Sequence, residues 1–148
     1  MSQPVPLQRA DLPSSNGNAS HLHADLTTAL QVRIESNPAL LAAVVGSVDG
    51  RAQTFAAQAG HSVEPARIAA LASSLLGLTE SFSREALHGN AHYNSIATEH
   101  GSIVVVRVPS RARAHVLSVW TARDETFAMT LRAALDIAAQ VARLLDHE

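Results

Sequence analysis

The chain has 148 residues, of which 47% are hydrophobic and only 3% aromatic, and its formal net charge at pH 7 is -2. This length predicts one domain with a buried core, and the weakly negative charge argues against general affinity for nucleic acid, which needs concentrated positive charge. There is no cysteine and all 11 basic residues are arginine, which excludes thiol nucleophiles, zinc–thiolate sites, disulfides, a Walker-type lysine and Schiff-base lysines.

The first 19 residues are rich in Pro, Ser and Asn and contain no apolar h-region. We interpret residues 1–19 as a disordered tail rather than a signal peptide, and residues 20–148 as one folded domain. No stretch reaches the roughly 20 apolar residues that a membrane-spanning helix requires. We therefore expect a cytoplasmic protein without membrane insertion.

A first helix and a β-hairpin should follow the tail. Ser20 can cap the helix, and Pro38 ends it because proline disfavours helical geometry at the preceding residue. The apolar run 40–48 is too short for a second helix, and Asp49-Gly50 after it is the strongest short-range signal for a hairpin. The apolar positions of the first helix recur every four residues: Leu22, Leu26, Leu30 and Ile34.

The next helix opens at Glu64-Pro65 and should end at Gly89, which can adopt the left-handed conformation. It carries two non-polar stripes and no charge between residues 68 and 79. The larger stripe is suited to lie on a sheet: Ile68, Leu71, Ala72, Leu75, Leu76, Thr79 and Phe82. The opposite stripe has only small residues, which suggests close packing against a partner: Ala66, Ala70, Ser73, Gly77 and Ser81.

Three strands in close succession are predicted over residues 91–98, 102–109 and 114–122, and this tight spacing favours an antiparallel meander. The second of them is apolar on both faces, so both faces of the sheet should be covered. Asp124 can cap a final helix, whose predicted buried stripe is Phe127, Leu131, Ala134, Leu135, Ala138, Ala142 and Leu145. The fold class is therefore α+β in the order α-ββ-α-βββ-α, with three helices divided between two faces of the sheet.

This ordered combination resembles the roadblock/LC7 family over roughly residues 22–145. The resemblance rests on the hairpin LLAAVVGSVDGRAQTFAAQAG, the uncharged middle helix, the strand GSIVVVRV and the closing amphipathic helix. It implies a five-stranded antiparallel sheet with the middle helix on one face and the two terminal helices on the other. It also implies a homodimer joined through the middle helix and the neighbouring edge strand, acting as a platform for Ras-like small GTPases.

The residues agree with such a dimer, because small side chains let two helix backbones approach closely. The strand 91–98 is the least hydrophobic, which suits an edge strand paired by a second chain. The predicted dimer interface consists of Ala66, Ala70, Ser73, Gly77 and Ser81 on the helix, and His92, Asn94 and Ile96 on the strand.

Other polar clusters suggest weaker sites. Arg107, Arg111 and Arg113 form the only dense basic patch, which is either a solvated loop or a contact for an acidic partner. His21 and His23 would point apart at a helix start, so we predict no metal site there. The histidines 88, 92 and 100 should be exposed, with a pH-sensitive dimer edge as the alternative.

No catalytic site is expected. Ser, His and Asp are all present, but no nucleophile elbow of the form G-x-S-x-G occurs. We therefore predict a non-enzymatic homodimeric adaptor, without a cofactor, that engages a Ras-like small GTPase and modulates its nucleotide state or localisation. Two alternatives stay open: a structural scaffold subunit of a larger assembly without a GTPase, and a small-ligand sensor.

Overall fold

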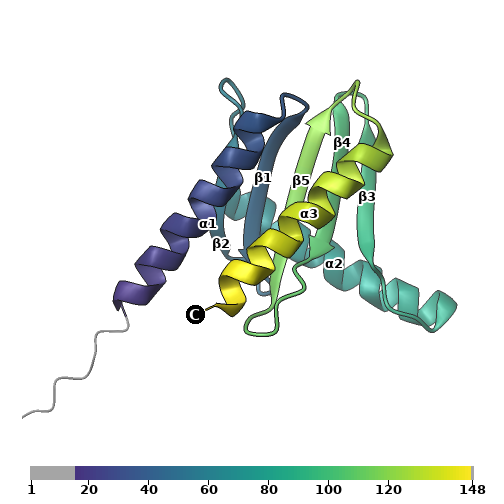
Figure 1. Cartoon of the computed structure of the whole chain (residues 1–148). Coiled ribbons are helices and arrows are strands. Elements are labelled where there is room, and N and C mark those ends of the chain that lie inside the picture. Colours follow the sequence, from purple (N-terminus) through teal and green to yellow (C-terminus); the bar gives the residue numbers. More distant parts are fainter. Residues whose placement is uncertain (1–15, 148) are drawn as a thin grey trace, which may run out of the picture.

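The computed structural model describes residues 16–147 and shows an α+β fold of three layers (Figure 1). A five-stranded sheet lies between one helix and a pair of helices. The elements in chain order are α1 Asn16–Ser36, β1 Leu40–Ser47, β2 Ala52–Ala57, α2 Pro65–Leu87, β3 Tyr93–Thr98, β4 Gly101–Arg107, β5 His115–Ala122 and α3 Phe127–Asp146. The predicted element order is confirmed.

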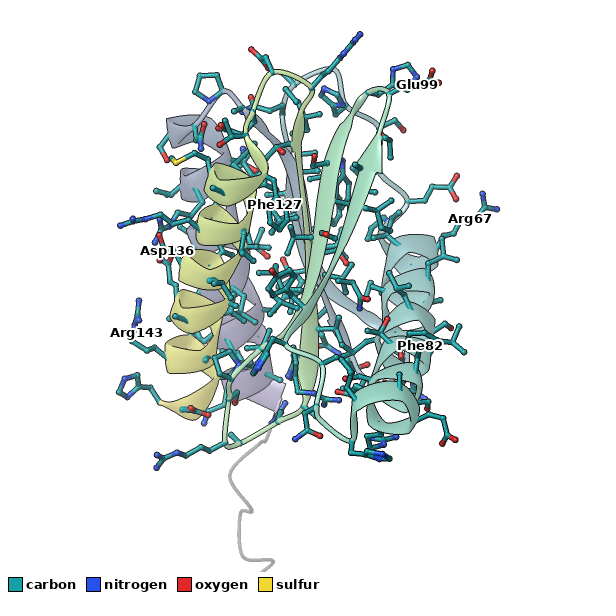
Figure 2. All side chains as sticks on the ribbon, turned by 90° about the vertical axis from the view of Figure 1, so that its right-hand side faces the viewer. Arg67, Phe82, Glu99, Phe127, Asp136 and Arg143 are labelled. Atoms are coloured by element: carbon teal, nitrogen blue, oxygen red, sulfur yellow. The ribbon has the colours of Figure 1, made fainter. Side chains whose placement is uncertain are left out.

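The sheet has the order β2-β1-β5-β4-β3, and every neighbouring pair is antiparallel. Helices α1 and α3 cover one face, and α2 covers the other (Figures 1 and 2). This is the arrangement that the family resemblance implied. It leaves β2 and β3 as the two edge strands.

Two hydrophobic clusters hold the layers together. The larger cluster lies between the sheet and the α1–α3 pair, and it includes Val104 and Val106. The smaller one lies under α2 and includes Val105 and Val116. Successive residues of β4 therefore enter different clusters, because neighbouring side chains of a strand point to opposite faces. This explains why that strand lacks polar alternation.

Helix α1 begins at Asn16, earlier than the predicted cap at Ser20. The Ser20 hydroxyl lies within the helix and donates to the Gly17 carbonyl at 2.9 Å. The predicted buried positions of the helix are correct: Leu26, Leu30 and Ile34 are buried and Leu22 packs beside them. Residues 1–15, the larger part of the predicted tail, lie outside the described residues.

The ends of the other helices differ from the prediction by one or two residues. His88, not Gly89, takes the left-handed conformation after α2, with φ 53°, and its N–H donates to the Arg84 carbonyl at 3.0 Å. Thr126, not Asp124, caps α3 by accepting a bond from the Met129 N–H at 3.3 Å. General cap propensities thus locate the helix ends only to within one or two residues.

The predicted stripe of α3 is also slightly rotated. Phe127 and Leu135 were expected in the core and are exposed, whereas Ile137 and Val141 are buried. Thr130 is fully buried as well, and its hydroxyl shares a 2.6 Å hydrogen bond with that of Thr121. A polar residue can occupy this core position because its hydrogen-bonding capacity is met.

Candidate interaction surface

The first half of α2 lies very close to the β1–β2 hairpin. A Cβ atom at Gly46 would stand only 2.8 Å from the Ala69 Cβ, and one at Gly50 would stand 3.3 Å from the Ala70 Cα. Ser73 adds a hydrogen bond from its hydroxyl to the Val48 carbonyl. Ala69, Ala70 and Ser73 therefore make contacts within the chain.

The larger apolar stripe of α2 is only partly core. Ala72 and Leu76 are buried, and Ile68 and Leu75 are half-buried. Contrary to the prediction, Leu71 and Phe82 are exposed, by 60% and 75%. Leu78, which lies outside both predicted stripes, is 70% exposed. The apolar arc of the helix is thus wider than the sheet can cover.

We define the α2 face by its exposed residues: Ala66, Ala70, Leu71, Gly77, Leu78, Ser81 and Phe82. The face combines three large apolar side chains with the small residues that were predicted to contact a partner. The C-terminal turns of α2 extend past β3, beyond the edge of the sheet (Figure 1). Exposed apolar groups grouped in this way are typical of an interaction surface.

An apolar groove of about 310 Å³ borders the α2 face, between the helix and the sheet. Trp120 and Ile103 contribute to its floor, and sequence analysis missed both. Because they lie on separate strands, their meeting under α2 depends on the β4–β5 register, which pairs Ile103 with Trp120. The other lining residues are Ile68, Leu71, Ala72, Leu75, Ile96, Val105 and Ser118.

The edge strand β3 continues the surface. Asn94 pairs with Val105 of the cluster under α2, and Ile96 with Ile103, so both lie on the α2 side of the sheet. Ile96 is exposed. The side-chain Oδ1 of Asn94 accepts a hydrogen bond from the Thr79 hydroxyl. The buried side-chain Nδ2 of Asn94 has no partner among the described residues. An edge strand also carries unpaired backbone groups that another chain can use.

The predicted interface residues thus take different positions. Ala66, Ala70, Gly77 and Ser81 are exposed on α2, and His92 is exposed just before β3. Ser73 is half-buried and engaged with the hairpin, and Asn94 is half-buried beside α2. Six of the eight therefore remain accessible to a partner, counting Ile96.

The three arginines do not form one patch. Arg107 extends to α2, where its Nη2 lies 2.7 Å from a carboxylate oxygen of Glu80. Arg111 instead belongs to the β4–β5 loop, which packs against the end of α3, on the other face of the sheet. Arg113 is an exposed residue of the same loop.

Asp146 at the end of α3 holds this loop. Its carboxylate accepts hydrogen bonds from the Ser110 hydroxyl at 2.6 Å and from the backbone N–H groups of Ala112 and Arg111. The bond from Ser110 is the largest cause that lowers the pKa of Asp146 below its ordinary value of 3.8. The loop is therefore anchored to α3 by an ionised carboxylate.

The remaining polar groups within residues 16–147 form no cluster with the composition of a metal site. No three His, Asp or Glu side chains of this part of the chain are placed to hold a metal ion. His88, His92 and His100 are exposed. Sequence analysis missed a buried histidine, His115, whose Nδ1 has no hydrogen-bond partner among residues 16–147. None of the helices in this range is long and apolar enough to cross a membrane.

Comparison with solved structures shows which known domains share this fold. MglB in a tetrameric arrangement superposes with a TM-score of 0.71, at 12% identity over 85% of this chain and 91% of that one. A roadblock/LC7 domain from Streptomyces avermitilis gives a TM-score of 0.67, at 20% identity over 80% and 96% of the two chains. The fold is therefore the roadblock/LC7 fold, as the resemblance indicated.

A looser likeness extends to an enzyme. A type II free methionine-R-sulfoxide reductase from Thermoplasma acidophilum superposes with a TM-score of 0.55, at 15% identity over 88% of this chain and 96% of that one. The sequence itself matches no protein-family model and no curated protein. Function must therefore be argued from the surface of this chain.

Proposed function

We propose that this chain is a non-catalytic, homodimeric adaptor of the roadblock/LC7 type that binds a Ras-like small GTPase and modulates its nucleotide state or localisation. The observation that carries the proposal is the α2 face, an apolar helix surface continuous with the free edge of β3. The GTPase comes from the resemblance to the roadblock/LC7 family, and the homodimer is also supported by the residues of α2 themselves.

The α2 face is complementary to itself. If two α2 helices pack antiparallel about a two-fold axis near Leu76, residues equally far from Leu76 in the two directions meet. Leu78 of one copy then meets the small residue Ser74 of the other. Leu71, five residues before Leu76, lies close to Phe82 of the other copy, six residues after it. Large side chains would thus fill the spaces left by small ones. MglB, a neighbour with this fold, is described in a tetrameric arrangement, which supports self-association.

The charges of α2 fit the same pairing. Arg67 and Glu85 are equally distant from Leu76, and their separation is a whole number of turns at ~3.6 residues per turn. They therefore share a side of the helix and would meet across the dimer with opposite charge. Among the described residues of the single chain, Arg67 makes only an exposed contact of 3.7 Å, with Glu64, and such surface pairs contribute little.

Cysteine cross-linking tests this pairing, because the chain has no cysteine of its own. We expect Arg67→Cys and Glu85→Cys copies to form a disulfide-linked dimer only when they are mixed. Each copy alone would leave its cysteines at opposite ends of the helix pair, too far apart for a disulfide. Glu99→Cys, at the tip of the β3–β4 hairpin, is the control. A mixture that cross-links no more than the control would contradict the antiparallel dimer.

Binding of the GTPase is tested separately. Ras-like GTPases from the source organism, loaded with GDP or a non-hydrolysable GTP analogue, are passed over the immobilised protein. We expect retention of at least one of them, and a change in its nucleotide exchange or hydrolysis rate. Phe82→Asp, which places a charge on the α2 face, should abolish both effects. Absence of retention in either nucleotide state would contradict the GTPase proposal and leave the dimer untouched.

The groove favours one alternative function, a small-ligand sensor. Its volume of about 310 Å³ is at the lower end of the range for ligand sites. Trp120, the only tryptophan of the chain, lines it and provides a fluorescence signal. A saturable change in Trp120 emission with an apolar metabolite would favour the sensor. No response across a metabolite panel, together with GTPase binding, would favour the adaptor.

A further inference from the structure

A second exposed apolar surface lies on the opposite side of the sheet, on the first half of α3. We define the α3 patch as Phe127, Ala128, Met129, Leu131, Arg132, Leu135 and Asp136, which together line a shallow concavity. Phe127, Met129 and Leu135 are exposed. Figure 2 shows Phe127 on the α3 layer and Phe82 on the α2 layer, separated by the sheet. The two surfaces therefore cannot serve the same contact.

The charged residues of the α3 patch have no partner of their own. Arg132 and Asp136 are one turn apart, yet neither makes a hydrogen bond or an ion pair with another described residue. Their positions flank Ala134, whose side chain is fully buried in the core. The outward side of the helix opposite Ala134 therefore carries one positive and one negative group, and the exposed Leu135 lies beside them.

This order of charges is self-complementary. In an antiparallel pair of α3 helices centred near Ala134, Arg132 of each copy meets Asp136 of the other, so both ion pairs form at once. Leu135 lies at almost the same level along the helix but to one side of the ion pairs, where it would contact its own counterpart. Met129 and the small residue Ala139 are also about equally far from the centre, so a large side chain again faces a small one.

We propose that the α3 patch is a second self-association surface, whose occupant is another copy of this chain. This inference goes beyond the proposed homodimer, because the α2 face and the α3 patch would then join four copies into a dimer of dimers. Two equivalent ion pairs form the centre of the contact, and the apolar side chains of Leu135 and Met129 flank them. The partner's Arg132 and Asp136 supply the charges that this chain leaves unpaired.

The mass of the full-length protein, measured by light scattering after size exclusion, tests the proposal. We expect the wild type to approach a four-copy mass as its concentration rises. Leu135→Asp should halve that mass by removing the α3 contact, and Phe82→Asp should halve it by removing the α2 contact. The double variant should be a monomer. Circular dichroism of each variant verifies that it is folded.

The outcomes separate the two surfaces. A Leu135→Asp protein with the wild-type mass overturns the α3 contact and leaves the α2 dimer unaffected. A Phe82→Asp protein with the wild-type mass overturns the α2 dimer and leaves the α3 contact unaffected. A wild type that never exceeds two copies at millimolar concentration also overturns the α3 proposal. It would point to another protein, or to residues 1–15, as the group that covers the patch.

Charge reversal gives a test that does not rely on Leu135→Asp. R132D makes the two charges of the patch both acidic, and D136R makes both basic. Each variant alone should lose the four-copy species through repulsion of like charges. An equimolar mixture should recover it, because every acidic group then faces a basic one. Two variants that associate as strongly alone as when mixed would overturn the antiparallel α3 pairing.

Discussion

Gly46 lies in β1 beneath α2, whereas Gly77 lies within α2 on its exposed side, so their surroundings differ. A methyl group on Gly46 would collide with the Ala69 Cβ at 2.8 Å and the Arg51 carbonyl at 3.1 Å. A methyl group on Gly77 would meet nothing within 4 Å outside its own helix. The sequence suggested a packing reason for Gly77, whereas within the single chain the close approach is at Gly46.

Substitution of these two glycines should change stability in opposite directions. We expect Gly46→Ala to lower the free energy of unfolding by about 1–3 kcal/mol, because neither neighbouring group is a flexible side-chain end. Gly77→Ala should raise it by about 0.5–1 kcal/mol through its better helix propensity. Urea denaturation at a fixed, low protein concentration measures both. A destabilised Gly77→Ala protein would show that this glycine is packed closely in solution.

Asp146 makes stability depend on pH. Its pKa in the folded state is lowered, chiefly by the Ser110 hydroxyl, so its contribution is fully present above the unfolded value of 3.8. That contribution is lost as the pH falls through the folded pKa, where the carboxylate takes up a proton. We therefore expect Asp146→Asn to be less stable than the wild type at pH 7, with the difference shrinking below pH 3.8.

Thermal unfolding of both proteins from pH 7 down to pH 2 checks this prediction. Asp124→Asn is the control, because the Asp124 carboxylate accepts no hydrogen bond among the described residues. Its difference from the wild type should not follow the same profile. A constant difference between Asp146→Asn and the wild type over the whole pH range would contradict the role of the carboxylate.

At the scale of elements, the helices were predictable from the sequence but their rotational setting was not. The four-residue period of α1 correctly predicted Leu26, Leu30 and Ile34 as buried. On α2 the same rule placed Leu71 and Phe82 in the core, although both are exposed. Periodicity shows that an apolar arc exists, but the part of the arc that the sheet covers depends on Gly46, which is distant in sequence.

Neighbouring leucines on α2 should therefore behave differently. Leu76 is buried in the cluster under the helix, whereas Leu78 is 70% exposed. We expect Leu76→Ala to cost about 2–5 kcal/mol of unfolding free energy by leaving a cavity. Leu78→Ala should cost less than ~0.5 kcal/mol at a concentration where the chain is monomeric, and should weaken the dimer instead.

Denaturation and light scattering on the same samples distinguish the two effects. The dissociation constant of the dimer should rise for Leu78→Ala while the monomer's denaturation midpoint stays in place. If Leu78→Ala destabilises the monomer as much as Leu76→Ala does, the α2 face is part of the core and the proposed dimer surface is wrong.

For the molecule as a whole, the sequence predicted the element order and the presence of helices on both faces. The Asp49-Gly50 signal located the hairpin, and the apolar strand 102–109 indicated that both faces of the sheet are covered, because each signal acts locally. The groove could not be predicted, since Trp120 and Ile96 meet only through the register of three strands. The three arginines were grouped by their spacing in sequence, whereas the sheet separates Arg107 from Arg111.

The free edge of β3 gives a prediction for the whole assembly. If two copies pair there, backbone amides of β3 should exchange hydrogen more slowly as the protein concentration rises. The amides of β2, the other edge strand, should exchange at a rate that does not depend on concentration. Hydrogen exchange with mass spectrometry measures both strands in one sample. Phe82→Asp should remove the concentration dependence of β3, and equal behaviour of the two strands would contradict the edge pairing.

Helix α1 begins and α3 ends at the same end of the molecule, on the layer away from α2 (Figures 1 and 2). A fluorescent reporter or a cargo domain attached to the end of α3 would therefore lie on the side of the molecule opposite α2. Two copies joined through α2 and β3 would carry two such cargoes. The dimer would thus display two attached domains on one side while the α2 faces of both copies remain buried against each other.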